Sequence, residues 1–262
     1  MTANHRLLRC TRYLLASVIK PCLVFLGIYL LAAFGLPLLL QLTASGGITY
    51  TIFGPDNMVS SVVFLFAGAI FLFVGGYAGF REDYNFLLAM SNTWRNQYGA
   101  ALLRTAVVAA GFTAVSFLMG WFERLFNQMV NQMANLSRIT DPGVVSTFVY
   151  TLGGRQPYSL AGEILLVFAA FLTVFLFGQT AAVYSYRWGV RFTVTFWILF
   201  GTSYIFLPIL ASISEGFRRF VMWFLSEGEG DTLLNIGWHL LVIAAMLIGL
   251  TGLGMRRLSQ NA

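Results

Sequence analysis

Long apolar stretches separated by short charged ones form the main pattern of this chain. A helix needs about 20 apolar residues to cross the hydrocarbon core of a bilayer. Six stretches come close to or exceed that length, and we predict six transmembrane helices with cores at residues 22–43, 58–80, 99–121, 159–186, 192–213 and 233–255. Residues 1–262 are therefore expected to form one transmembrane domain of an all-α, polytopic membrane protein.

The composition excludes the other broad classes of protein. Hydrophobic residues make up 58% of the chain and charged residues 10%, with a mean hydropathy of +0.76, whereas soluble domains are about a quarter charged. The same values exclude intrinsic disorder. Two cysteines, Cys10 and Cys22, are too few for a small disulfide-bonded scaffold.

Lys and Arg residues are divided unevenly between the two sides of the predicted bundle. With the N-terminus inside the cell, 11 of the 16 basic residues fall on the inner side. Basic residues near the ends of spans favour the cytoplasm, so we predict that both termini are cytoplasmic. The net charge of +6 is then a topology signal, and no nucleic-acid partner is expected because the sequence has no basic cluster larger than Arg6, Arg9 and Arg12.

Three amphipathic segments accompany the spans. Residues 5–20 combine leucines and arginines at roughly helical spacing, which predicts an elbow helix on the inner leaflet that ends at Pro21. A basic flank that only fixes the topology explains this segment equally well. Residues 81–98 predict a short cytoplasmic helix between the second and third spans, and residues 214–226 predict a helix at the outer interface between the fifth and sixth spans.

The cytoplasmic segment carries its charges where they stabilise a helix. Glu82 and Asp83 fall in its first turn and Arg95 near its end, as the helix dipole favours. One interpretation is a plain connector at the membrane surface. The other is a docking element that presents charged and aromatic side chains to a partner. The outer segment likewise predicts either a plain interfacial helix or an outer gate.

Several kinds of catalytic and cofactor sites are absent from the sequence. Lys20 is the only lysine and Pro21 follows it, so the chain has no P-loop for ATP. The two histidines and two cysteines lack metal-ligand spacing, so neither a metal nor another cofactor is expected. Ser203 and His239 are the one candidate pair for an intramembrane serine protease. Packing and interfacial roles are the competing interpretation of this pair.

Polar residues at membrane depth are further candidates, because they are costly there unless they face a bundle or a cavity. Gln179 lies within the fourth span and predicts either a pathway-lining residue or a helix–helix hydrogen bond. Arg104 and Glu163 lie near the ends of spans, where their side chains are expected to snorkel to the interface. We therefore expect no inner pair of charged residues of the ion-coupling kind, which disfavours a secondary transporter.

Small residues four positions apart lie on one helix face and permit close packing. Gly75 with Gly79 in the second span and Ala245 with Gly249 in the sixth form two such pairs. Both pairs are expected to be contact faces between helices.

One stretch of the sequence resembles a known family. Residues 80–89 read F-R-E-D-Y-N-F-L-L-A, which is similar to the R-E-D-F-x-F-x-L stretch before the coupling helix in bacterial permease subunits of ABC-2-type (type V) ABC transporters. The six predicted spans, the inner termini, the elbow and the two amphipathic helices also resemble that family. Residues 90–95 depart from it, because they read M-S-N-T-W-R where the family often has a G-V-S-R-like turn.

The resemblance implies a permease in the bacterial plasma membrane that is not itself an enzyme. Two separate ATP-binding cassette ATPase subunits would bind a homo- or heterodimer of permease subunits through the coupling helices and drive export. The 25 phenylalanines and nine methionines suggest a hydrophobic or amphipathic substrate. The residues implied in coupling are Arg81, Glu82, Asp83, Tyr84, Phe86, Leu87, Asn92 and Arg95, and those implied in an outer gate are Phe217, Phe220, Trp223 and Phe224. A non-catalytic accessory membrane protein is the remaining alternative.

Overall fold

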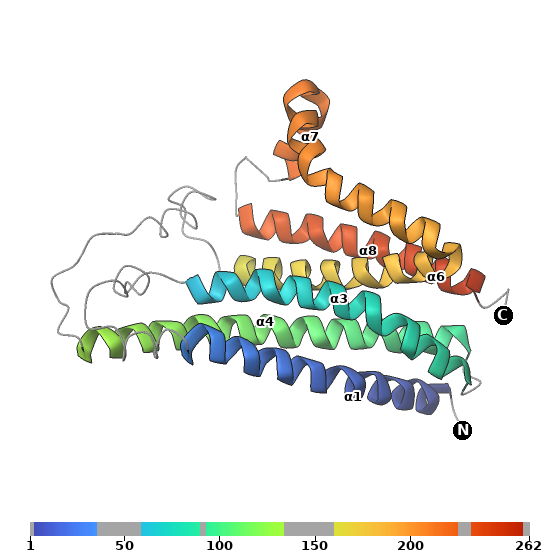
Figure 1. Ribbon diagram of the computed structural model, residues 1–262, viewed down its shortest axis with the longest axis horizontal. Coiled ribbons are helices and arrows are strands. Elements are labelled where there is room, and N and C mark those ends of the chain that lie inside the picture. The colour runs from blue at the N-terminus through green and yellow to red at the C-terminus, as the bar shows by residue number, and fades with distance from the viewer. Residues whose placement is uncertain (1–2, 36–58, 90–92, 134–159, 225–231, 259–262) are drawn as a thin grey trace. The chain divides into compact units, whose positions relative to one another are not determined.

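The computed structural model describes residues 3–35, 59–89, 93–133, 160–224 and 232–258, and these residues form helices without any strand (Figure 1). The elements in chain order are α1 (Ala3–Leu30), the π-helix η1 (Leu31–Gly35), α3 (Val59–Ala89), α4 (Trp94–Met133), α6 (Leu160–Ile213), α7 (Glu215–Phe224) and α8 (Thr232–Leu258).

Five helical stretches among the described residues are long and apolar enough to cross a bilayer: Leu7–Gly35, Val63–Phe80, Trp94–Phe122, Leu160–Gly189 and Leu233–Leu258. They overlap five of the six predicted spans, and residues 36–43 of the first predicted span lie outside the described residues. The all-α class is confirmed, and the five stretches have the length and composition of a multi-pass membrane protein.

The N-terminal segment does not form a separate elbow helix. α1 continues through Pro21, so the amphipathic stretch and the start of the first span are one helix and the predicted break is wrong. A proline inside a helix removes one backbone hydrogen bond. Membrane helices tolerate that loss, because their other backbone groups have no water to bind and must stay paired within the helix.

The predicted cytoplasmic helix over residues 81–98 is also wrong as a single element. α3 continues past the end of its span to Ala89, and α4 begins at Trp94. The carbonyl oxygen of Thr93 accepts hydrogen bonds from the backbone N–H groups of Asn96, at 3.0 Å, and Gln97, at 3.2 Å. Residues 80–89 contain neither glycine nor proline, so nothing ends the helix at the membrane boundary.

α6 reverses direction at Gly189 and so contains two antiparallel arms (Figure 1). Gly189 has a φ of 73°, a left-handed conformation that residues with a Cβ adopt only rarely. Ring centroids of Phe177 and Phe196 lie 5.6 Å apart, and those of Tyr184 and Phe192 lie 6.3 Å apart, so the arms pack side by side. The arms, residues 160–188 and 190–213, correspond to the fourth and fifth predicted spans.

The chain forms two compact units. The first comprises Met1–Ala16, Ala69–Ala110 and Tyr158–Ala262. In this unit α8 packs along the first arm of α6 and runs in the same direction. The Thr173 hydroxyl donates to the Leu240 carbonyl, at 3.1 Å, and the Thr180 and Thr251 hydroxyls share a hydrogen bond of 2.7 Å. These bonds connect α6 and α8 at two levels without needing water.

The second unit comprises Ser17–Gly68 and Gly111–Pro157. Its core in the described residues is aromatic. The rings of Phe25, Phe64 and Phe112 lie 5.9–6.1 Å apart in each pairing, and Tyr29 meets Phe64 edge-on at 5.1 Å. Aromatic packing of this kind holds α1, α3 and α4 together in this unit.

Two glycines allow α3 and α6 to touch backbone to backbone. A Cβ at Gly76 would lie 2.7 Å from the Phe175 carbonyl oxygen, and a Cβ at Gly178 would collide with the Phe73 carbonyl oxygen. Such contacts need residues without side chains at the crossing point. The glycines predicted from spacing are different ones, because a Cβ at Gly75 or at Gly249 would meet no described atom within 4 Å. Neither glycine therefore takes part in a close helix crossing among the described residues.

Candidate functional site

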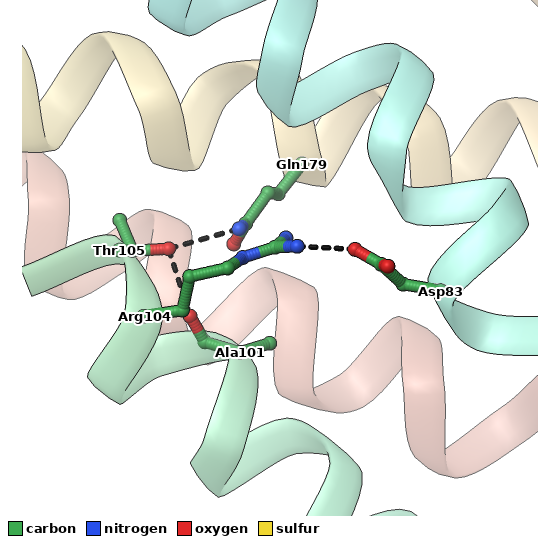
Figure 2. Close-up of polar contacts among 5 residues, drawn as sticks. All are labelled: Asp83, Ala101, Arg104, Thr105 and Gln179. Carbon is green, nitrogen blue, oxygen red and sulfur yellow. Dashed lines mark hydrogen bonds and ion pairs between the residues drawn. The ribbon is translucent and has the colours of Figure 1, made fainter. Parts of the chain in front are cut away.

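A buried ion pair joins α3 to α4 inside the first unit (Figure 2). The Nη1 group of Arg104 donates to the Oδ2 atom of Asp83. The side chain of Arg104 is 2% exposed and that of Asp83 is 13% exposed. This ion pair is thus almost completely removed from solvent at the cytoplasmic end predicted for the bundle.

Chain geometry brings these two residues together. Asp83 lies six residues before the end of α3 at Ala89, and Arg104 lies ten residues after the start of α4 at Trp94, so both are close to the connection between two antiparallel helices. Long side chains in a helix lean toward its N-terminus. The Arg104 side chain therefore extends back toward the start of α4, which is the direction in which Asp83 lies.

The surroundings of Arg104 are partly apolar and partly polar. Its guanidinium carbon lies 5.7 Å from the centroid of the Phe175 ring on α6, a cation–π contact. Beside it, Gln179 Nε2 donates to Thr105 Oγ1 at 2.8 Å, and that hydroxyl donates to the Ala101 carbonyl at 2.9 Å (Figure 2). Three helices thus contribute to one polar cluster, defined by Asp83, Arg104, Thr105 and Gln179.

The energetics of this cluster favour a functional role over a purely stabilising one. Moving an ion from water into a protein interior costs several kcal/mol even after relaxation, and pairing offsets that cost only when further hydrogen bonds are made. Arg104 Nε has no hydrogen-bond partner among the described residues. Hydrophobic residues in these places would connect the helices at lower cost. Ionisable groups within membrane helices are rare and usually serve a function.

The prediction that Arg104 snorkels to the interface is wrong. Arg104 does not snorkel to the interface, because Asp83 offers it a carboxylate inside the protein. Asp83 and Arg104 form a buried pair of opposite charges, and the prediction that no ion-coupling pair exists stays a prediction. The signal that could have revealed the buried pair was the position of both residues close to the short connection between two antiparallel helices.

Two of the predicted coupling residues, Asp83 and Tyr84, face the interior of the protein. Tyr84 is buried and stacks on Phe80 with centroids 5.4 Å apart, and the Tyr186 ring meets it edge-on at 5.5 Å. Burial, followed by the nearby Tyr186 hydroxyl, raises the pKa of the Tyr84 phenol above its ordinary value. Tyr84 and Asp83 thus fix the end of α3 against α6 and α4.

The remaining coupling residues are described less completely. Arg95 is exposed in the first turn of α4, and its guanidinium carbon lies 5.7 Å from the centroid of the Trp94 ring. Arg81, Glu82, Phe86 and Leu87 belong to α3, but their side chains are outside the described part of the chain, and Asn92 is wholly outside it. Contact between these residues and a partner stays a prediction.

The outer amphipathic helix is present as α7. The Ser214 hydroxyl accepts a hydrogen bond from the Phe217 N–H at 3.3 Å, which caps the start of the helix, and Arg219 pairs with Glu215 at 2.6 Å on its exposed surface. Trp223 is exposed, and its ring packs at a tilt on that of His239 of α8, with centroids 4.3 Å apart.

Two of the predicted gate residues, Phe217 and Trp223, are described, and both belong to α7. Phe217 is half-buried, and Trp223 packs on α8. The side chains of Phe220 and Phe224 lie outside the described residues. The same is true of Ser203, so the proposed pair with His239 stays a prediction. The contact of His239 with Trp223 gives that histidine a packing role.

Gln179 forms the helix–helix hydrogen bond that was one of its two predicted roles. Replacing Gln179 with Leu is expected to lower the free energy of unfolding by about 0.6–2 kcal/mol, the range for interhelical hydrogen bonds in membranes. Thr105 keeps its bond to Ala101, which limits the loss. Unfolding by dodecyl sulfate in mixed micelles measures the change. In a double-mutant cycle with Thr105→Val, fully additive losses would show that the two side chains do not interact.

No protein-family model, curated protein or solved structure matches the chain. Function is therefore inferred from the residues of this chain and from their geometry. The polar cluster and the charged end of α3 next to it are the features with the most specific chemistry in the described residues.

Proposed function

We propose that this chain is the transmembrane permease subunit of an ATP-driven transporter of the ABC-2 (type V) class. It would export a hydrophobic or amphipathic compound. Because the sequence has no P-loop, ATP would be hydrolysed by a separate ATPase subunit, and a second permease subunit would complete the complex.

The end of α3 is the observation that carries this proposal. α3 stays helical to Ala89, beyond its apolar span, and this charged end is fixed in place on two sides. Asp83 pairs with Arg104 of α4, and Tyr84 packs on Tyr186 of α6. A force applied to this end by a partner would therefore move α4 and α6 as well, which is what coupling to an ATPase requires.

The proposal includes six spans with both termini in the cytoplasm. The second arm of α6, residues 190–213, would be the span in addition to the five long apolar stretches. Arg187 and Arg191 flank the reversal at Gly189, and Arg256 and Arg257 end α8. With the N-terminus inside, all four lie on the cytoplasmic side, in agreement with the positive-inside rule.

We assign the coupling residues two roles within this proposal. Asp83 and Tyr84 would hold the end of α3 from the inside. Contact with the ATPase would then fall to Arg81, Glu82, Phe86, Leu87, Asn92 and Arg95. Phe217, Phe220, Trp223 and Phe224 would form the outer gate, and Gln179 would line the pathway only when its bond to Thr105 opens.

Replacing Glu82 and Arg95 together with Ala is expected to weaken binding of the ATPase about tenfold or more and to abolish substrate-stimulated ATP turnover, because charged contacts at a protein interface would be lost. Co-purification and ATP turnover of complexes in proteoliposomes provide the measurements. Glu215→Ala with Arg219→Ala is the matched control, since it removes one acid and one base from the exposed surface of α7. Equal effects of the two double variants, or none, would refute the coupling role.

A further inference from the structure

Five segments of the first unit meet at one end of its helices. Phe80, Tyr84, Val183 and Met255 form one hydrophobic cluster, which joins the ends of α3, of the first arm of α6 and of α8. Cys10, Leu14 and Ala100 form another, which joins the start of α1 to the start of α4. The reversal of α6 and the end of α8 therefore lie next to each other.

Arginines gather at this end although they are far apart in sequence. Arg187 follows Val183 by one helical turn, and Arg257 directly follows the segment of α8 that touches Val183. Arg191 lies just beyond the reversal and is exposed. The same end also contains Arg9, Arg12, Arg95 and Arg256. We call these seven residues the arginine rim. Apart from the buried pair of Asp83 and Arg104, they are all the charged side chains described at this end, and all are positive. The sequence showed only scattered basic residues here.

Aromatic side chains place the arginine rim at the level of lipid headgroups. The Arg187 guanidinium carbon lies 5.5 Å from the Trp188 ring centroid, and Trp188 is 52% exposed. The Arg95 guanidinium lies over Trp94 in the same way. Tryptophan concentrates where membrane meets water. An arginine beside an aromatic ring keeps several N–H donors that can bind phosphate.

Exposed apolar surface begins directly beside the rim. Leu253 of α8, one turn before Arg257, is 57% exposed, and Ile198 of the second arm of α6 is 58% exposed. A ligand that fits both features has an anionic group next to long hydrocarbon chains. A phospholipid has both parts. An acidic protein surface could pair with the arginines, but it has no acyl chains to cover the exposed apolar side chains.

We propose that the arginine rim binds the phosphate headgroups of anionic phospholipids, with Arg187, Arg191 and Arg257 as the main contacts. The acyl chains lie along the exposed apolar faces of α8 and of the second arm of α6. Each arginine near an anionic surface strengthens binding about fivefold. This inference requires only that the chain spans a bilayer, so it stands or falls independently of an ATPase partner.

Native mass spectrometry of the full chain, purified in a neutral detergent and titrated with phosphatidylglycerol or phosphatidylcholine, tests the proposal. The wild type is expected to retain phosphatidylglycerol selectively. Arg187→Gln, Arg191→Gln and Arg257→Gln combined are expected to weaken that retention about 100-fold. Arg218→Gln with Arg219→Gln is the control, because both residues are exposed on α7, which contacts the opposite end of α8 at His239. The control is expected to bind like the wild type.

Three results would overturn the proposal: equal retention of the two lipids by the wild type, an equal loss in the control, or undiminished phosphatidylglycerol binding in the triple variant. Loss of ATPase binding with lipid binding intact would instead assign the rim to a protein partner. If the triple variant does not fold, the salt dependence of lipid binding by the wild type tests the proposal instead. Selectivity of the wild type for phosphatidylglycerol must fall as ionic strength rises, and selectivity that persists in high salt would refute an electrostatic headgroup contact.

Discussion

Replacing Arg104 with Met is expected to lower the free energy of unfolding by about 3–5 kcal/mol, the cost of leaving one member of a buried ion pair without its partner. Methionine preserves most of the side-chain volume and the contact with Phe175, so the loss reports the charge and not a cavity. Unfolding by dodecyl sulfate in mixed micelles, followed by circular dichroism, measures the change.

Two further variants separate this effect from general damage. Asp83→Asn in the Arg104→Met background removes the orphaned carboxylate and is expected to recover part of the lost stability. Arg219→Met breaks the exposed pair with Glu215 and is expected to cost only about 0.3–0.5 kcal/mol. The buried pair would lose its assigned importance if Arg104→Met were no more damaging than Arg219→Met.

Replacing Gly178 with Ala is expected to destabilise the protein by about 3 kcal/mol or more, because the new Cβ would occupy the position of the Phe73 carbonyl oxygen. The colliding atom belongs to the backbone, so α3 and α6 must separate as whole helices. Gly76→Ala is expected to act in the same direction, since its Cβ would lie 2.7 Å from both the ring and the carbonyl oxygen of Phe175. The same unfolding assay applies.

Gly75→Ala provides the matched control for these two variants. Gly75 is adjacent to Gly76 in α3, yet a Cβ there would meet no described atom within 4 Å. Alanine is a better helix former than glycine by about 1 kcal/mol, so this variant should be neutral or stabilising. The test is whether the two kinds of variant change the free energy of unfolding in opposite directions. A similar loss of stability in Gly75→Ala and Gly178→Ala would contradict the close crossing of α3 and α6.

Features that depend on local pattern could be predicted from the sequence. The apolar stretches and their charged boundaries predicted five of the long helices and the amphipathic α7, because burial in lipid acts on each stretch by itself. The two arms of α6 were also predicted, since Arg187 and Arg191 interrupt the apolar run close to Gly189.

Features that depend on contacts between segments could not be predicted. Pro21 and the boundary after Phe80 were read as helix ends. α1 continues through Pro21 because a membrane helix keeps its backbone hydrogen bonds internal, and α3 continues past Phe80 because residues 80–89 contain neither glycine nor proline. Spacing could not choose Gly76 over Gly75, because only the crossing with α6 distinguishes the two. Arg104 was assigned to the interface, because its neutralising partner lies on another helix.

The buried pair also has an electrical consequence. A single arginine that moved with α4 across the bilayer field would do work of about 2.3 kcal/mol for each full charge carried through 100 mV. Asp83 and Arg104 carry opposite charges at the same level, so a displacement of α3 and α4 together transfers no net charge from this pair. The membrane voltage neither drives nor opposes such a displacement through these residues.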